Sequence, residues 1–139
     1  MTRRARAYTS GEAAGVALVL SQPLSFWGGI DVETGRIIDH SHPNRGASVT
    51  ATVLVMPAGR GSSSSASVLA ESLRRGTGPV AIVLSTADPI LTVGALVAAS
   101  LYGRQCPIVV CSIEDIATGD GIEVSAGEEG LITLVSPRG

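Results

Sequence analysis

The residues best suited to chemistry lie in a glycine- and serine-rich segment, Gly59-Arg60-Gly61-Ser62-Ser63-Ser64-Ser65. It follows an apolar run that ends before Pro57, and it precedes a stretch with helical spacing of apolar residues. A turn between a strand and a helix directs several unpaired backbone N–H groups at one point. The helix N-terminus adds about half a positive charge there, so a carboxylate or phosphate group would suit the position. Serines also cap helices, and simple capping stays open as the alternative.

This segment does not match the common phosphate-binding loops. The Walker pattern needs a lysine, and all ten basic residues of this chain are arginine. The dinucleotide pattern GxGxxG fails at Ser64. A serine-hydrolase site is weaker still, because GxSxG is absent and only His40 and His42 could act as bases.

A second candidate is the segment Asp39-His40-Ser41-His42-Pro43-Asn44-Arg45. Two histidines near an aspartate could bind a metal ion, but they are too few to complete a site. We expect a loop ordered by side-chain hydrogen bonds instead. Cys106 and Cys111 form neither a CxxC pair nor a metal quartet, which favours small buried residues in a reducing compartment.

Composition restricts the class of protein. At 139 residues the chain fits one domain, 1–139, and 45% hydrophobic against 16% charged residues argues against disorder. A net charge of −2 and 3% aromatic residues argue against a nucleic-acid partner. No apolar run reaches the roughly 18–20 residues that cross a bilayer. The N-terminal arginines resemble a signal peptide only superficially, because Glu12 and Gly15 interrupt the apolar stretch. We expect a cytoplasmic protein with no membrane partner.

The elements that must position these residues follow from apolar periodicity and from helix end signals. Strands are expected at 15–20, 50–56, 80–84 and 107–111, and a hairpin at 122–124 and 131–135. One helix should run from the serines to Gly76, and a second from Asp88-Pro89 to Gly103. The order predicts an α/β fold, a mixed sheet with two main helices plus a β-rich accessory layer.

Three segments carry a resemblance to a known family: FWGGIDVETGRIIDHSHPNRG (26–46), LVMPAGRGSSSSASVLAE (54–71) and ADPILTVGALVAA (87–99). In their order and spacing they resemble the small subunit of aconitase X, over nearly the whole chain. The resemblance implies the swivelling β/β/α domain of the aconitase superfamily, closing over a large catalytic subunit. It also implies an iron–sulfur cluster bound by that large subunit and no metal bound by this chain.

The resemblance further implies roles for single residues. The family's proton acceptor, the first serine after the glycine turn, falls on Ser62. Since serine is a poor base near neutral pH, its alkoxide would need helix N-terminal amides and a nearby cation, for which Arg60 is the candidate. We expect the substrate to be bound by Arg60, Gly61, Ser63, Ser64 and His42. Ser65 is expected to be a structural cap, and exposed apolar surface around Phe26 and Trp27 to contact the large subunit.

Two activities are known in the family, and both remove water from a small hydroxy acid. A chain that uses arginine for every basic residue and is rich in Ala and Gly favours a bacterial cis-3-hydroxy-L-proline dehydratase, which forms 1-pyrroline-2-carboxylate. The alternative is (R)-5-phosphomevalonate dehydratase. Two other classes stay open. One is a non-catalytic anion-binding module. The other is a phosphohistidine carrier, because residues 119–135 faintly resemble the terminal hairpin of such carriers.

Overall fold

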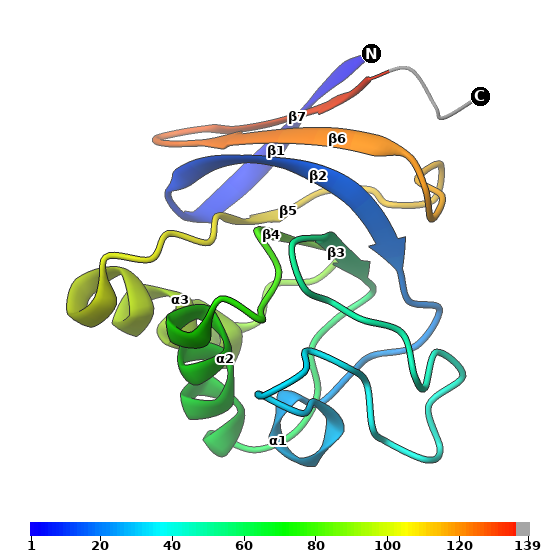
Figure 1. Cartoon of the computed structure of the whole chain (residues 1–139). Helices are drawn as coiled ribbons and strands as arrows, with labels where there is room; N and C mark the ends of the chain where they lie inside the picture. The colour runs from blue at the N-terminus through cyan, green and yellow to red at the C-terminus, as the bar shows by residue number, and fades with distance from the viewer. Residues whose placement is uncertain (136–139) are drawn as a thin grey trace.

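The strands of this protein close into a barrel that lies against a layer of helices (Figure 1). The computed structural model describes residues 1–135. The strand order around the barrel is β1-β5-β4-β3-β2-β6-β7. The strands are β1 (Thr2–Thr9), β2 (Gly11–Val19), β3 (Val53–Met56), β4 (Ala81–Leu84), β5 (Ile108–Val110), β6 (Gly121–Ala126) and β7 (Gly130–Leu134), and the helices are α1 (Phe26–Gly29), α2 (Ser64–Arg75) and α3 (Pro89–Tyr102).

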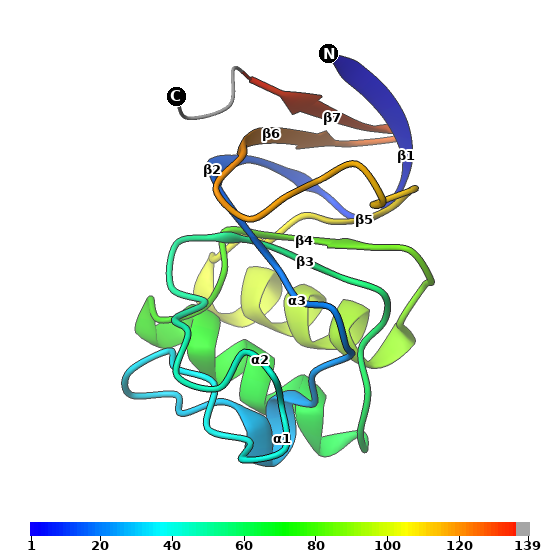
Figure 2. The ribbon, with the colours of Figure 1, turned by 90° about the vertical axis from the view of Figure 1, so that its right-hand side faces the viewer.

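One half of the barrel is a parallel sheet formed by β2, β3, β4 and β5. Every residue of β3 and β4 is buried, because both faces of these strands are covered. Alternate side chains point to opposite faces. Leu54 and Met56 join the cluster beneath the helices, whereas Val53 and Val55 join the cluster inside the barrel. Figure 2 shows α2 and α3 on one side of β3 and β4, with β6 and β7 on the other.

The other half of the barrel is antiparallel and corrects the predicted architecture. The mixed sheet with its helical layer is confirmed, but the expected accessory layer is part of the same closed barrel. Closure depends on β1, which pairs with β7 through its first half and with β5 through its second half. The sequence TRRARAYT gives little sign of this strand, because its buried face carries small alanines rather than large apolar residues.

The helix ends agree with the predicted signals. Gly76 ends α2 in the left-handed region at φ 79°, and Gly103 ends α3 in the same way at φ 65°. Asp88 caps α3 by accepting hydrogen bonds from the N–H groups of Ile90 and Leu91. A third, four-residue helix, α1, follows β2 and was not predicted. None of the helices in residues 1–135 has the length and apolarity that a membrane span requires.

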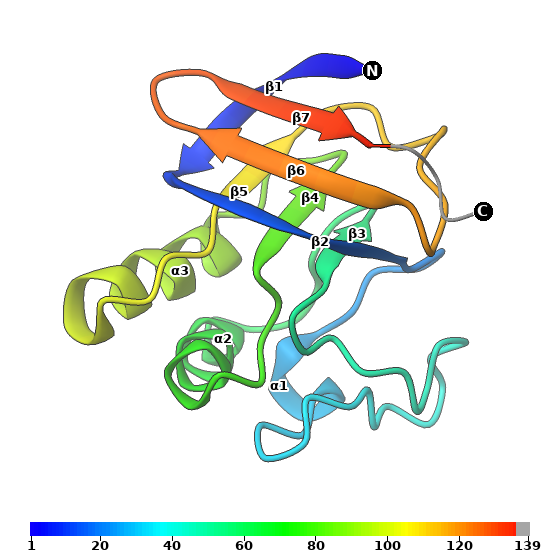
Figure 3. The same ribbon diagram turned by 45° about the horizontal axis from the view of Figure 1, so that its top comes forward.

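A long excursion, residues 20–52, connects β2 to β3 and carries α1, which packs beside α2 (Figure 3). It contains α1 but otherwise only single bridges, such as Ile30 with Ile37 and Arg36 with Ser48. Buried Phe26, Ile37 and Val49 anchor it in the cluster beneath the helices. The excursion begins next to the carboxyl ends of the parallel strands, where Leu24 bridges Gly59, and reaches their amino ends, where Thr50 bonds to Thr77.

Candidate functional site

The candidate site lies where three neighbouring parallel strands end. Because β2, β3 and β4 run in the same direction, the segments that follow them meet at one edge of the sheet. The carbonyl of Pro57, after β3, accepts the N–H groups of Ser85 (3.2 Å) and Thr86 (3.1 Å), after β4. On the other side, Leu24 and Gly59 form a parallel bridge. The segment from Pro57 to Ser63, which we call the Gly-Ser loop, is thus held between both neighbours.

Two glycines allow this loop to pack closely. A Cβ at Gly59 would overlap Oδ2 of Asp88, and a Cβ at Gly61 would overlap Oγ of Ser25. Gly61 also has φ 111°, which an L side chain rarely adopts. The loop therefore has a wall on each side, one from the α3 cap and one from the segment before α1.

The serines at the start of α2 differ in their surroundings. Ser62, Ser63 and Ser64 are exposed. The Oγ of Ser62 accepts the N–H of Ser64 at 3.3 Å, so a helix N-terminal amide already faces this oxygen. Ser63 occupies the capping position, but its side chain makes no cap hydrogen bond. Capping by Ser63 is therefore not observed, and three serine side chains line an accessible helix N-terminus.

Ser65 is buried and connects two helices. Its Oγ accepts the N–H of Trp27 at 3.1 Å and lies 3.4 Å from Oγ of Ser25. The expected cap is thus a link between α1 and α2 instead. The expected apolar surface is also only partly right, because Trp27 is 60% exposed whereas Phe26 is fully buried.

Arg60 connects the Gly-Ser loop to the excursion. Its side chain is 59% exposed, and Nη2 lies 4.0 Å from Oδ2 of Asp39. The other carboxylate oxygen of Asp39 accepts both the Oγ–H (2.7 Å) and the N–H (2.9 Å) of Ser41. These hydrogen bonds, together with the charge of Arg60, lower the pKa of Asp39. A negative charge is therefore fixed beside an otherwise accessible guanidinium group.

His42 orders the excursion rather than facing open space. It is 6% exposed, its Nε2 lies 3.2 Å from the carbonyl of Gln22, and its Nδ1 accepts the N–H of Asn44 at 3.0 Å. This pairing fits a ring in which Nε2 donates and Nδ1 accepts. Both nitrogens already have protein partners, so the predicted contact with substrate has no free nitrogen here. His40 is exposed.

The two cysteines are free thiols in apolar surroundings. Burial raises the pKa of the Cys106 thiol to about 12, and burial also raises the pKa of the half-buried Cys111. Both environments favour the protonated thiol in the metal-free chain. Within residues 1–135, no group of three or more His, Cys, Asp or Glu side chains is placed to hold a metal ion.

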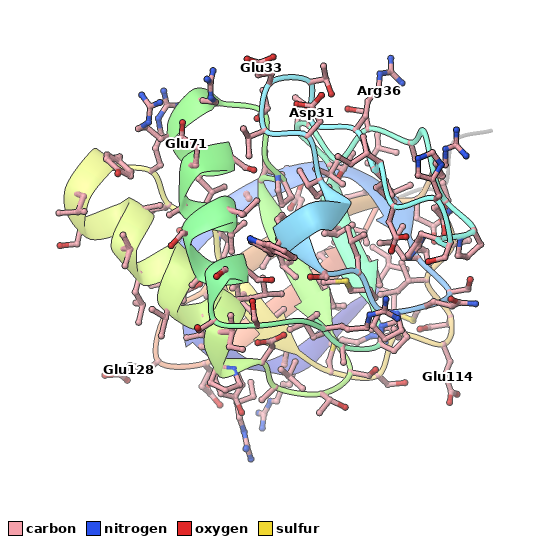
Figure 4. The ribbon with its side chains drawn as sticks, turned by 90° about the horizontal axis from the view of Figure 1, so that it is seen from below. Asp31, Glu33, Arg36, Glu71, Glu114 and Glu128 are labelled. Atoms are coloured by element: carbon pink, nitrogen blue, oxygen red, sulfur yellow. The ribbon has the colours of Figure 1, made fainter. Side chains whose placement is uncertain are left out.

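Acidic residues of the excursion lie at the opposite end of α2 from Ser62. Figure 4 shows Asp31 and Glu33 at the end of the molecule that also carries Glu71. The Oγ1 of Thr77, just after α2, donates to the carbonyl of Val32 at 2.7 Å. Two residues that do contact the Gly-Ser loop, Ser25 and Asp88, were not predicted as site residues. The meeting of strand ends at one sheet edge was the signal that could have found them.

Comparison with known proteins identifies the family of this chain. The model of the aconitase X swivel domain matches residues 2–134. The cis-3-hydroxy-L-proline dehydratase of Hypocrea jecorina is 42% identical over 109 residues, which are 78% of this chain but 18% of that protein. The phosphomevalonate dehydratase small subunit of Methanosarcina acetivorans is 33% identical over 140 residues, covering 98% of this chain and 92% of that subunit.

A solved structure supports the same assignment. The crystal structure of Thermococcus kodakaraensis aconitase X in its holo-form superposes with a TM-score of 0.88 and 29% identity, covering 98% of this chain and 99% of that chain. The match of the family model over residues 2–134 and these similarities lead to one conclusion: the chain belongs to the aconitase X swivel-domain family.

Proposed function

We propose that this chain is the small subunit of an aconitase X hydro-lyase and that Ser62 is its catalytic base. The observation that carries this proposal is the position of Ser62, exposed at the start of α2 with an amide N–H directed at its Oγ. Dehydration beside a carboxylate requires a base for the α-proton. Ser62 would accept that proton on Oγ, where the Ser64 N–H and the positive end of α2 favour negative charge.

The neighbouring residues supply the substrate contacts. Backbone N–H groups around Gly61 and the hydroxyls of Ser63 and Ser64 would bind the substrate carboxylate. Arg60 would add a cation that both holds the substrate and stabilises the Ser62 alkoxide. We assign His42 an indirect part: it orders the loop that carries Asp39, and Asp39 in turn holds Arg60.

The departing hydroxyl group requires a Lewis acid. Cys106 and Cys111 belong to no group of three or more potential ligands within residues 1–135. We therefore assign the iron–sulfur cluster to a large partner subunit and expect the isolated chain to be inactive. The exposed Trp27 beside the Gly-Ser loop would lie at the contact with that subunit.

For the substrate we favour cis-3-hydroxy-L-proline, which would yield 1-pyrroline-2-carboxylate. The arginine-only composition of basic residues supports a bacterial source, and one relative carries this activity in its name. (R)-5-phosphomevalonate is the alternative, since another relative carries that name. A phosphohistidine carrier has less support, because His42 is buried and His40 lies in the excursion rather than at the start of α2 or α3.

The test is an anaerobic dehydration assay of this chain assembled with its large subunit, with both substrates in parallel. We expect turnover of cis-3-hydroxy-L-proline, and Ser62→Ala should reduce it by about 10²–10⁴-fold because a general base is lost. Ser67→Ala, an exposed serine on the same helix, is the matched control and should retain turnover.

Size-exclusion chromatography of both variants with the large subunit separates a lost base from a lost complex. Near-normal turnover of Ser62→Ala would contradict the base assignment. Turnover of phosphomevalonate alone would change the substrate but not the reaction class. If an assembled, cluster-loaded complex turns over neither substrate, the hydro-lyase proposal is contradicted and an anion-binding module is favoured.

A further inference from the structure

The two carboxylate oxygens of Asp88 have different surroundings. Oδ1 accepts the N–H groups of Ile90 (2.9 Å) and Leu91 (3.1 Å), which makes Asp88 the N-cap of α3. The cap would be complete with this oxygen alone, since serine and asparagine cap helices about as well as aspartate. Oδ2 instead faces the Gly-Ser loop at Gly59.

The contact with Gly59 is close enough to determine the residue type there. A Cβ at Gly59 would overlap Oδ2 of Asp88 and lie 2.9 Å from Cδ1 of Leu91. Unlike Gly61, Gly59 does not have a positive φ, so its backbone conformation is open to any residue. Glycine is therefore required at position 59 by space, and Asp88 provides much of the crowding.

This contact lies between two others that hold the loop. Before it, the carbonyl of Pro57 is bonded to Ser85 and Thr86; after it, Gly61 packs against Ser25. Arg60 and Ser62 lie on either side of Gly61 and project from this fixed stretch into solvent. A contact that fixes the position of the Gly59 backbone therefore also fixes where the Arg60 and Ser62 side chains begin.

We propose that Asp88 is a positioning residue for the Gly-Ser loop: its Oδ1 caps α3, while its Oδ2 forms the wall on which the Gly59 backbone rests and thereby places Arg60 and Ser62. The effect of Asp88 variants on turnover rests on the proposed function, whereas their effect on the loop does not. The wall itself is a property of the full chain and can be measured without a partner.

Two substitutions separate the cap from the wall. Asp88→Ser keeps a capping oxygen and removes the second oxygen, whereas Asp88→Asn keeps the cap and fills the same space at Gly59. We expect both variants to melt within a few degrees of the parent chain. In ¹⁵N relaxation of the full chain, the order parameters of Gly59–Ser62 should fall from about 0.85 to below about 0.6 in Asp88→Ser. The same amides should keep parental values in Asp88→Asn, and the Ile90 and Leu91 amides should be unchanged in both.

The assembled enzyme gives the second readout. Because small misplacements of catalytic groups cost up to about 10²-fold, kcat of Asp88→Ser should fall by about 10-fold or more while Asp88→Asn retains it. The proposal would be overturned if the Gly59–Ser62 order parameters of Asp88→Ser matched those of the parent chain. It would also be overturned if kcat fell equally in Asp88→Asn and Asp88→Ser. If the parent complex dehydrates neither substrate, the proposed function fails, and the relaxation data still decide whether Asp88 is the wall.

Discussion

Two glycines of one loop are needed for different physical reasons. Gly61 is required by its backbone, because φ 111° strains any other residue, and by its contact with Ser25. Gly59 is required by its neighbour Asp88. Making Asp88 smaller should therefore relieve a substitution at Gly59 but not one at Gly61.

We predict that Gly59→Ala reduces the free energy of unfolding by about 1–3 kcal/mol, as overpacking does. Combining it with Asp88→Ser should recover part of that loss, because the overlapping oxygen is gone. Urea unfolding of the two single variants and the double variant gives a coupling energy, expected at about 0.5–3 kcal/mol for residues in contact. Gly61→Ala is the control that Asp88→Ser should not relieve. Strict additivity of Gly59→Ala and Asp88→Ser would contradict the prediction.

At this scale the sequence revealed the local chemistry but not the distant contacts. The strand–turn–helix pattern was enough to place Ser62 at an exposed helix start, because every residue in that argument is close in sequence. The partners of the loop, Ser25, Asp39 and Asp88, are 20 or more residues away, and only the strand order brings them together. The chemistry of His42 is visible in the sequence, but its burial and its contact with the carbonyl of Gln22, 20 residues earlier, are not.

Helix α2 carries its own electrostatic stabilisation at the end away from the site. Glu71 accepts hydrogen bonds from Arg74 at 2.7 and 2.8 Å and from Arg75 at 3.1 Å, and Figure 4 shows Glu71 on the outside of the molecule. These contacts lower the pKa of Glu71 from 4.5 to about 2. Both arginines also lie in the last turn, where a cation interacts well with the helix dipole.

The pH dependence of this contribution has a definite sign. Because the folded pKa is depressed, the stabilisation is fully present above the unfolded value near 4.5 and is lost as pH falls toward about 2. We predict that Glu71→Gln lowers Tm slightly at pH 7. The difference in Tm between the variant and the parent protein should disappear between pH 4.5 and 2. Thermal melts across this range measure it, with Glu128→Gln on an exposed turn as the control for loss of one carboxylate. A Tm difference that grows as the pH falls would contradict a stabilising role of ionised Glu71.

Elements with marked ends were predicted well, and elements without them were not. Asp88-Pro89, Gly76 and Gly103 gave α2 and α3 nearly their observed bounds, since caps are local. The bounds of β4 and β5 were also close, because buried strands are continuous apolar runs. Strand β3 begins at Val53 rather than at residue 50, since Ala51 has φ 61°, outside the extended region. Strand β1 was missed because its arginines alternate with small alanines, so that burial is visible only when β5 and β7 are in place.

A buried hydroxyl links β1 to the segment that leads into β5, where the barrel closes. At Thr9 the pairing of β1 with β5 shifts register. The Thr9 Oγ1 donates to the carbonyl of Cys106 at 2.7 Å and accepts the N–H of Ile108 at 2.8 Å, and so replaces the regular ladder at this point. Two buried backbone groups therefore rely on a single side chain.

We predict that Thr9→Val, which keeps the shape but not the hydroxyl, destabilises the protein by about 1–3 kcal/mol for each backbone group left unpaired. Thr2→Val, at the exposed start of the same strand, should change stability by less than about 0.5 kcal/mol. Chemical unfolding followed by far-UV circular dichroism measures both. Equal effects of the two substitutions would show that the register shift does not need the hydroxyl.

The first and last strands of the barrel lie side by side. The amide of Leu134 bonds to the carbonyl of Met1 at 2.8 Å, and Thr2 pairs with Thr133. A segment that precedes β1 and a segment that follows β7 would therefore leave the barrel at the same place. This geometry suits both arrangements seen among the relatives, in which the same domain is most of a small subunit or about a fifth of a longer enzyme. Fusion and fission of such genes would leave the domain itself unchanged.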